Sequence, residues 1–129
     1  MLTKEFINPS PMGFSNSVAY TSNGVRTILI SGQVGYDGTE IPEGIGAQAE
    51  IAFANLAKEL KAAGADVGDV IKINTYIVGM DRERSTAVGH VKAKYFTQEN
   101  QPAATWVGVA SLIFPSLLVE IEATAVVEA

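Results

Sequence analysis

Near the end of the chain, residues 117–127 read LLVEIEATAVV, and this stretch decides the fold. Within it, Val119, Ile121, Ala123 and Ala125 alternate with mainly polar residues. Because successive side chains of a strand point to opposite faces, the alternation predicts a strand with one buried and one polar face. Such a strand belongs to a sheet that is covered on one side.

The segments before this strand predict two helices and five more strands. The strands are expected at residues 4–7, 17–21, 26–30, 70–78 and 105–109, and the helices at 46–63 and 81–97. Two successive strand–helix–strand units have right-handed crossovers, which place both helices on one face of a mixed sheet. We therefore expect an α+β fold of order β-β-β-α-β-α-β-β, as a single domain over residues 1–129.

Local signals mark several boundaries of these elements. Asn23-Gly24 predicts a hairpin turn between the second and third strands. Gly64 is expected just after the first helix, and Asp81 is expected to cap the second. In the strand at 70–78, Ile71, Ile73 and Ile77 are expected on one face, with Lys72, Asn74 and Tyr76 on the other.

A sheet with both helices on one face leaves its other face without cover. Residues 26–30 are apolar on both faces, and Trp106 and Val107 point in opposite directions. Apolar side chains on an open face indicate a second chain that covers them. We therefore expect an oligomer.

Composition excludes several classes of function. The chain has 129 residues, of which 47% are apolar, and its net charge is −5. The nine basic residues are scattered, so no surface is expected to follow a phosphate backbone, and nucleic-acid binding is disfavoured. No apolar run is long enough to span a bilayer and the first residues lack a secretory pattern, so we expect neither a membrane partner nor export, and a cytoplasmic location.

The chain has no cysteine and one histidine, His90. A disulfide, a thiolate nucleophile and a zinc–thiolate site are therefore excluded, and we expect no metal site. His90 lies in the second predicted helix, with no Asp or Ser spaced to orient it. It is compatible with a surface histidine or with one that lines a pocket.

Glu120 and Glu122 lie on the same face of the last strand, about 7 Å apart by strand geometry. Two interpretations are compatible with the pair. One is a solvated polar face; the other is a partly buried carboxylate of raised pKa that acts as a general base for water.

Two other segments are candidates for ligand contact. Ser31-Gly32-Gln33 ends a buried strand, where glycine either lets a ligand approach the backbone or makes a tight strand exit. Thr105 and Trp106 begin the fifth strand, and the indole is suited either to the core or an interface, or to stacking on a ligand.

The chain resembles the RidA/YjgF family of reactive-intermediate deaminases, also labelled endoribonuclease L-PSP. The resemblance rests on ordered segments along nearly the whole length, at residues 9–15, 30–34, 48–49, 55–56, 62–65, 69–72, 95–96, 102–103 and 118–123. It implies a chorismate mutase-like fold and a homotrimer with three pockets between neighbouring subunits. It also implies cofactor-free hydrolysis of enamines and imines of amino acids, such as 2-aminoacrylate.

Carried over by position, the resemblance implies that Ser31 lines the pocket and that Glu120 positions the attacking water. An arginine that holds the substrate carboxylate is replaced by Ala104, and a pocket tyrosine is replaced by Phe14. Trp106 stands in place of a small residue. In the second helix, Gly89 takes the position of a common asparagine.

These departures imply an arginine-lacking branch of the family. Because loss of the charged clamp costs a few kcal/mol, efficient deamination of 2-aminoacrylate is not expected. A bulkier neutral substrate that stacks on Phe14 and Trp106 fits the exchange better. Three functions are compatible with the sequence: imine or enamine hydrolysis or tautomerisation, a non-catalytic metabolite-binding or regulatory trimer, and a ribonuclease, which the acidic charge disfavours.

Overall fold

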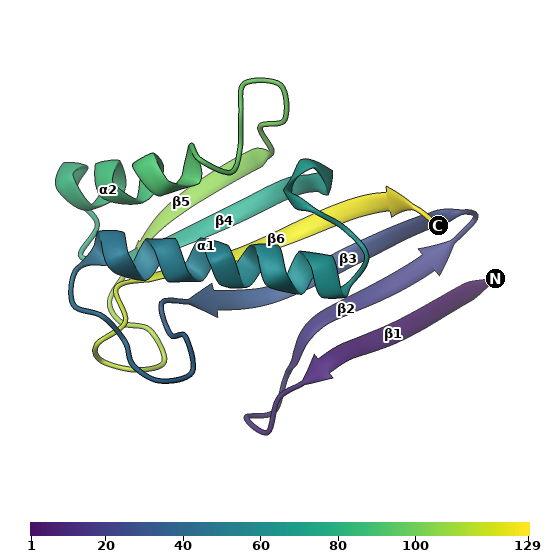
Figure 1. Cartoon of the computed structure of the whole chain (residues 1–129), viewed down its shortest axis with the longest axis horizontal. Helices are drawn as coiled ribbons and strands as arrows, with labels where there is room; N and C mark the ends of the chain where they lie inside the picture. The colour runs from purple at the N-terminus through teal and green to yellow at the C-terminus, as the bar shows by residue number, and fades with distance from the viewer.

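The computed structural model describes residues 1–129, which form one mixed sheet with two helices (Figure 1). The elements are β1 (Leu2–Pro9), β2 (Ser15–Ser22), β3 (Val25–Val34), α1 (Ile45–Ala62), a short 3-10 helix (Val67–Asp69), β4 (Val70–Val78), α2 (Arg82–Lys92), β5 (Ala103–Val109) and β6 (Val119–Glu128). The strand order is β1-β2-β3-β6-β4-β5, and only β4 and β5 pair in parallel. The predicted α+β fold and order of elements are confirmed.

The last strand, β6, lies inside the sheet between β3 and β4 and pairs antiparallel with both. Its residues Val119, Ile121, Ala123 and Ala125 are buried, as the alternation predicts. Full burial of a valine or isoleucine side chain stabilises the fold by about 1.5–3 kcal/mol. The opposite face of the same strand carries the two glutamates.

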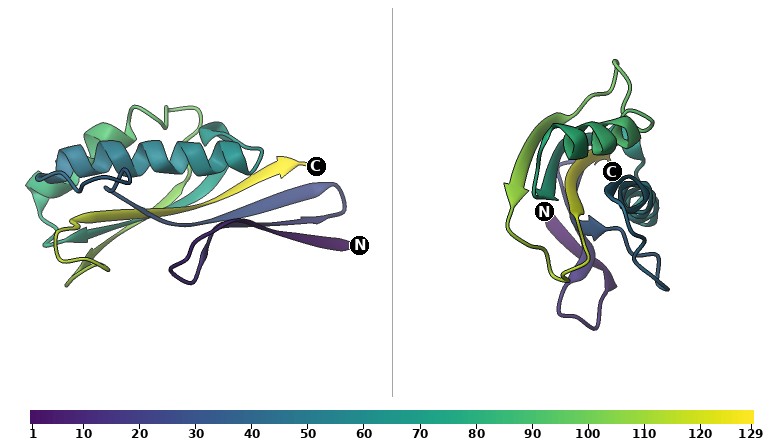
Figure 2. Two further views of the ribbon diagram at one scale, coloured as in Figure 1. Left: turned by 60° about the horizontal axis from the view of Figure 1, so that its bottom comes forward. Right: turned by 90° about the vertical axis from the view of Figure 1, so that its left-hand side faces the viewer.

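Both helices cover the same face of the sheet (Figure 2). The helix α1 buries a stripe at three- and four-residue spacing that consists of Ala49, Ala52, Phe53, Leu56 and Leu60. It ends at Ala62, and Gly64 just beyond it has a φ of 90°, a backbone conformation that glycine adopts without strain. Neither helix is long and apolar enough to cross a bilayer.

The second helix, α2, begins as predicted and ends earlier. The Asp81 carboxylate accepts a hydrogen bond from the Arg84 amide at 2.8 Å, which caps the helix. The helix stops at Lys92, five residues before the predicted end at Thr97. Beyond it, Tyr95 and Phe96 pack on Phe53 of α1, with ring centroids 5.4 and 6.5 Å away. Because those contacts are with a distant segment, helical periodicity could not reveal them.

A bulge at the start of β4 changes which face Ile71 occupies. The pairing with β6 moves from Val70 opposite Ala125 to Lys72 opposite Thr124, so Ile71 is the extra residue. Val70 is buried in its place, whereas Ile71 is exposed. The prediction that Ile71 shares a face with Ile73 was therefore wrong.

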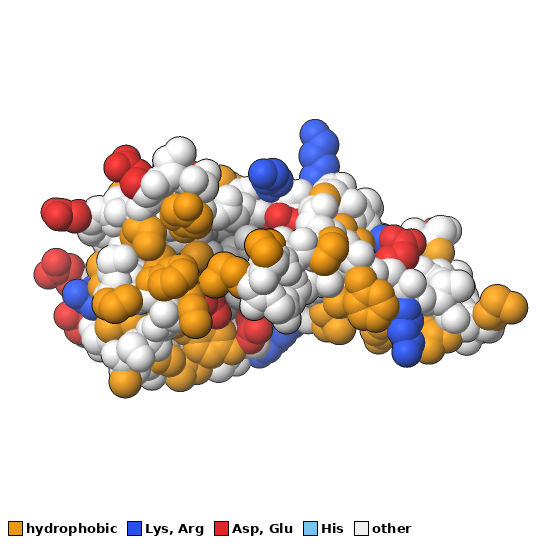
Figure 3. All heavy atoms as spheres, turned by 90° about the horizontal axis from the view of Figure 1, so that it is seen from below, with side chains coloured by type: hydrophobic (Ala, Val, Ile, Leu, Met, Phe, Trp, Pro, Cys, Tyr) orange, Lys and Arg blue, Asp and Glu red, His pale blue; other side chains and the backbone are white.

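The sheet face opposite the helices is uncovered within the chain. It carries exposed Tyr20, Leu29 and Val107 on three different strands. Hydrophobic side chains also gather at the end of the molecule where the loop between β5 and β6 lies, and this loop contributes exposed Ile113 and Phe114 (Figure 3). Apolar side chains thus remain on this surface, and the second chain that would cover them stays a prediction.

Candidate functional site

The end of β3 is irregular, and this irregularity builds one wall of the site. The pairing with β6 moves from Ile30 opposite Ala123 to Gln33 opposite Ile121, so Ser31 and Gly32 form a bulge. The Ser31 hydroxyl donates to the Ser15 carbonyl at 2.6 Å. This bond ties the bulge to the start of β2, directly after the exposed Phe14.

The carboxylate of Glu120 lies against the bulge. A Cβ atom placed on Gly32 would be 2.3 Å from Oε2 of Glu120, so a larger residue here would displace the carboxylate from this position. Glycine at this position is therefore what leaves room for the carboxylate. The structure brings together three of the predicted site residues: Ser31, Gly32 and Glu120.

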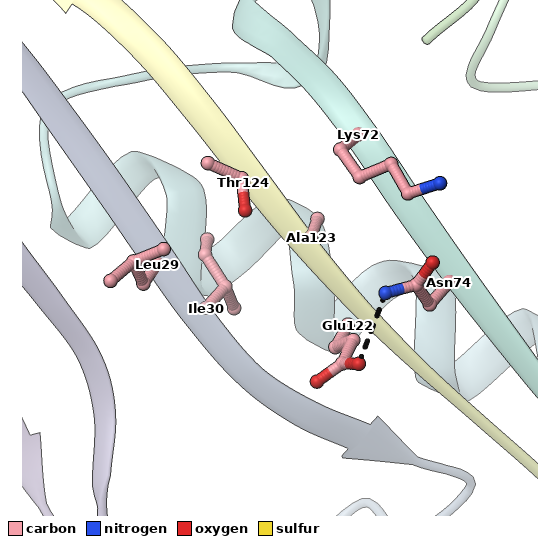
Figure 4. A pocket seen from close by; sticks show the side chains of 7 residues that line it. All are labelled: Leu29, Ile30, Lys72, Asn74, Glu122, Ala123 and Thr124. Atoms are coloured by element: carbon pink, nitrogen blue, oxygen red, sulfur yellow. Dashed lines mark hydrogen bonds between the residues drawn. The ribbon is translucent and has the colours of Figure 1, made fainter. Parts of the chain in front are cut away.

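The neighbouring carboxylate, Glu122, is held by two donors. The Asn74 amide donates to its Oε1 at 3.2 Å (Figure 4). The Tyr76 hydroxyl donates a hydrogen bond to the same oxygen. The bond to Glu122 is also the main reason why the pKa of Tyr76 is raised. Glu122 is thereby held in place as a hydrogen-bond acceptor on the open face of the sheet.

Glu120 has a different environment, because its side chain makes no hydrogen bond or ion pair within the chain. Burial, and then the negative charge of Glu122, raise the pKa of the Glu120 carboxyl. Two carboxylates on one face are thus distinguished by their surroundings. Glu122 is bonded to two donors, whereas Glu120 is unbonded and has a raised pKa.

An open pocket of about 210 Å³ adjoins Glu122 on the uncovered face (Figure 4). It is lined by residues of β3, β4 and β6: Leu29, Ile30, Lys72, Asn74, Glu122, Ala123 and Thr124. Lys72 donates to the Thr105 hydroxyl at 2.8 Å, which places Thr105 on this face as well.

Trp106 lies on the other side of the sheet, where it faces α2. It lines a second pocket, of about 330 Å³, together with Met80, Ser85, Thr86 and Gly89. Ala104 is exposed and, two residues before Trp106 on β5, lies on the same side. Within one chain, the structure therefore does not bring Trp106 and Ala104 to Glu120. His90 is exposed on α2.

Three residues near these pockets were not identified as site residues from the sequence: Asn74, Tyr76 and Lys92. Alternation along β4 puts Asn74 and Tyr76 on the polar face, but only the strand pairing shows that they lie opposite Glu122 and Glu120. No three Asp, Glu or His side chains lie where they could share a metal ion.

The fold and the two glutamates on its open face define a small α+β protein with a carboxylate site. The model of a protein family described as Endoribonuclease L-PSP matches residues 10–127. The 2-iminobutanoate/2-iminopropanoate deaminase of Rattus norvegicus is 40% identical over 104 residues, which cover 78% of this chain and 73% of that relative. The chain belongs to the RidA/YjgF family, also described as endoribonuclease L-PSP.

Solved structures share the fold. The structure of RidA from an Antarctic Psychrobacter has a TM-score of 0.77 at 32% identity, and the match covers 92% of this chain and 93% of that one. A member of the YjgF/YER057c/UK114 family from Mycobacterium tuberculosis has a TM-score of 0.79 at 30% identity, with 97% and 100% covered. The predicted family is confirmed.

Proposed function

We propose that this protein hydrolyses a reactive imine or enamine of a small metabolite without a metal or organic cofactor, and that Glu120 activates the water. The observation that carries the proposal is the half-buried Glu120 carboxylate, which lies beside Gly32, makes no hydrogen bond and has a raised pKa. A 40% identical relative named as a deaminase of 2-iminobutanoate and 2-iminopropanoate supports the reaction class.

The reaction needs only water as a second reactant. Glu120 takes a proton from water as the water oxygen bonds to the imine carbon, and it passes that proton to the imine nitrogen. It then takes the hydroxyl proton of the carbinolamine and passes it to the nitrogen as the C–N bond breaks. The products are a carbonyl compound and ammonia. An enamine enters the same route once its β-carbon has gained a proton and its nitrogen has lost one, which gives the imine.

The pocket in this proposal lies between neighbouring subunits of a homotrimer. Two observations support a shared pocket: Glu120 and Trp106 lie on opposite faces of one sheet, and the face of Glu120 carries exposed apolar side chains. In a cyclic trimer, the Trp106 side of one copy can meet the Glu120 side of the next. Phe14, Ser31 and Thr105 then complete the walls.

Ala104 supplies no positive charge to such a pocket, and two of the three arginines of the chain are engaged elsewhere. Arg26 bonds to Glu5 and to the Ala63 carbonyl, and Arg84 donates to the Val78 carbonyl. The chain is thus an arginine-lacking member in this proposal. Weak activity on 2-aminoacrylate follows, because that substrate offers little besides its carboxylate for binding.

Ammonia release tests the reaction directly. Wild type is expected to release ammonia from imines with bulky side chains and little from 2-aminoacrylate. Ala104→Arg is expected to raise kcat/KM for 2-aminoacrylate about 10- to 100-fold, the usual worth of a charge-assisted pair. If neither protein releases ammonia from any imine in the panel, the hydrolase proposal is wrong.

A non-catalytic trimer that binds a metabolite is the second candidate, and the loss of a charged clamp at Ala104 favours it. Under that alternative, Glu120→Gln leaves ligand affinity nearly intact and there is no turnover to lose. Ribonuclease activity fits less well, because the net charge is −5 and the one histidine, His90, is exposed on α2.

A further inference from the structure

Lys92 is a half-buried cation without an acidic partner. It is the last residue of α2, and its ammonium lies 5.4 Å from the ring centre of Trp106. The ion pairs of the chain, Arg26 with Glu5 and Lys94 with Glu50, do not include it. The ammonium has three N–H donors, and none of them donates to a protein group.

The contact with the indole explains the position of the ammonium, but the indole does not accept hydrogen bonds from the three N–H donors. A cation over an aromatic face is stabilised electrostatically, and the negative face of the indole suits an ammonium. Burial lowers the pKa of Lys92, and no acidic group opposes that effect. A partly desolvated cation of this kind is stabilised further by an anionic ligand.

The second pocket adjoins the same indole. Ser85 and Gly89 line that pocket from α2, and helical spacing continues their face to Lys92 one turn later. Nothing lies within 4 Å of the position that a Cβ atom of Gly89 would occupy, so this wall is open. Along Trp106 there is thus a hollow for an apolar group and, next to it, a cation.

We propose that Lys92 binds the carboxylate of the substrate in the place that Ala104 leaves without charge, and that the Trp106 pocket holds the substrate's side chain. This inference rests on the proposed function, because it names the residue that recognises the substrate of the same site. It replaces the sequence-based expectation of a neutral substrate with an acidic one. A lysine makes one contact with a carboxylate where an arginine makes two. The side chain of the substrate therefore contributes a larger share of the binding energy than it would in a pocket with an arginine.

Lys92→Gln tests the assignment in two separate assays. In the first, affinity for phenylpyruvate, a 2-oxo acid with a bulky side chain, is measured by calorimetry and is expected to fall about 10- to 100-fold. In the second, KM for the matching 2-imino acid is expected to rise by the same factor, while kinetics on an imine without a carboxylate stay unchanged. Lys92→Arg is expected to restore most of the affinity.

Lys94→Gln is the matched control, because Lys94 is an exposed lysine two residues away that pairs with Glu50. It should bind the oxo acid like wild type. Equal affinity of wild type and Lys92→Gln for phenylpyruvate overturns the assignment, and so does a wild type that does not bind it. If wild type binds the oxo acid but does not turn over the imine, the hydrolase proposal is rejected and the role of Lys92 in binding stands.

Discussion

Glu120→Gln is expected to lower kcat for a bulky imine by about 10²- to 10⁴-fold, the usual contribution of a general acid–base group. Glutamine keeps the size of the side chain next to Gly32 but cannot accept a proton. Affinity for the product should change little, because the carboxylate exchanges protons in this account and does not hold the ligand. Steady-state ammonia release and calorimetry with the oxo acid measure the two effects.

The same substitution should not weaken the fold at neutral pH. Burial and Glu122 raise the pKa of the Glu120 carboxyl above its ordinary value of 4.5, so the charged form is less favourable in the folded state. Above the folded-state pKa this charge reduces stability, and below 4.5 it does not contribute. Glu120→Gln should therefore raise Tm at pH 7, and the difference from wild type should disappear as the pH falls below 4.5.

Glu122→Gln is the matched control for the reaction. Glutamine still accepts hydrogen bonds from Tyr76 and Asn74, so most of the turnover should remain. Removal of the neighbouring charge should move the acidic limb of the kcat/KM profile to lower pH. A Glu120→Gln protein that turns over imines like wild type would contradict the catalytic role of Glu120.

Gln48→Ala is expected to lower the free energy of unfolding by about 3 kcal/mol, because it leaves three partly buried backbone groups without their side-chain partner. Gln48 is 1% exposed on α1. Its amide donates to the carbonyls of Pro42 and Ser116 at 3.0 and 2.9 Å, and its carbonyl accepts from the Leu118 amide at 2.8 Å. It thus joins the loop before α1 to the start of β6, two residues before Glu120.

Urea unfolding measures this loss, and Gln101→Ala, at an exposed glutamine, is the control. The change at Gln101 should lie within about 0.5 kcal/mol of wild type. Should Gln48→Ala unfold at the same urea concentration as Gln101→Ala, the bonds that anchor β6 would be of little energetic importance.

Local patterns were sufficient to predict most of the fold. The alternation in β6 and the helical stripe of α1 each give a correct element, because burial of one face sets the periodicity. Gly64 and Asp81 mark correct helix ends, because caps are local. The end of α2 and the face of Ile71 could not be predicted, since the first depends on Phe53 and the second on a bulge in the pairing with β6.

The candidate site was predicted only in part. Ser31, Gly32 and Glu120, which the sequence singled out separately, lie together in the structure, and their roles stay predictions. Trp106 and Glu120 lie on opposite faces of the sheet. The sequence alone does not show which face Trp106 occupies relative to Glu120, so this separation could not be predicted. The sequence does not reveal Lys92 as a site residue, because its contact with the Trp106 ring joins two separate elements of the chain.

The central claim is that one reaction site is shared between two copies of the chain, and subunit mixing tests it most directly. Glu120→Gln removes the proposed proton acceptor from one side of the site. Gly89→Phe fills the pocket beside Trp106 on the other side, at a position where a Cβ atom meets no neighbour. Each variant alone should release little ammonia from a bulky imine. In trimers assembled from equal amounts of both variants, about a quarter of the interfaces pair an unmodified Glu120 with an open Trp106 pocket. Recovery of about a quarter of the wild-type rate is the predicted result, whereas a mixture no more active than its parents would contradict the shared site.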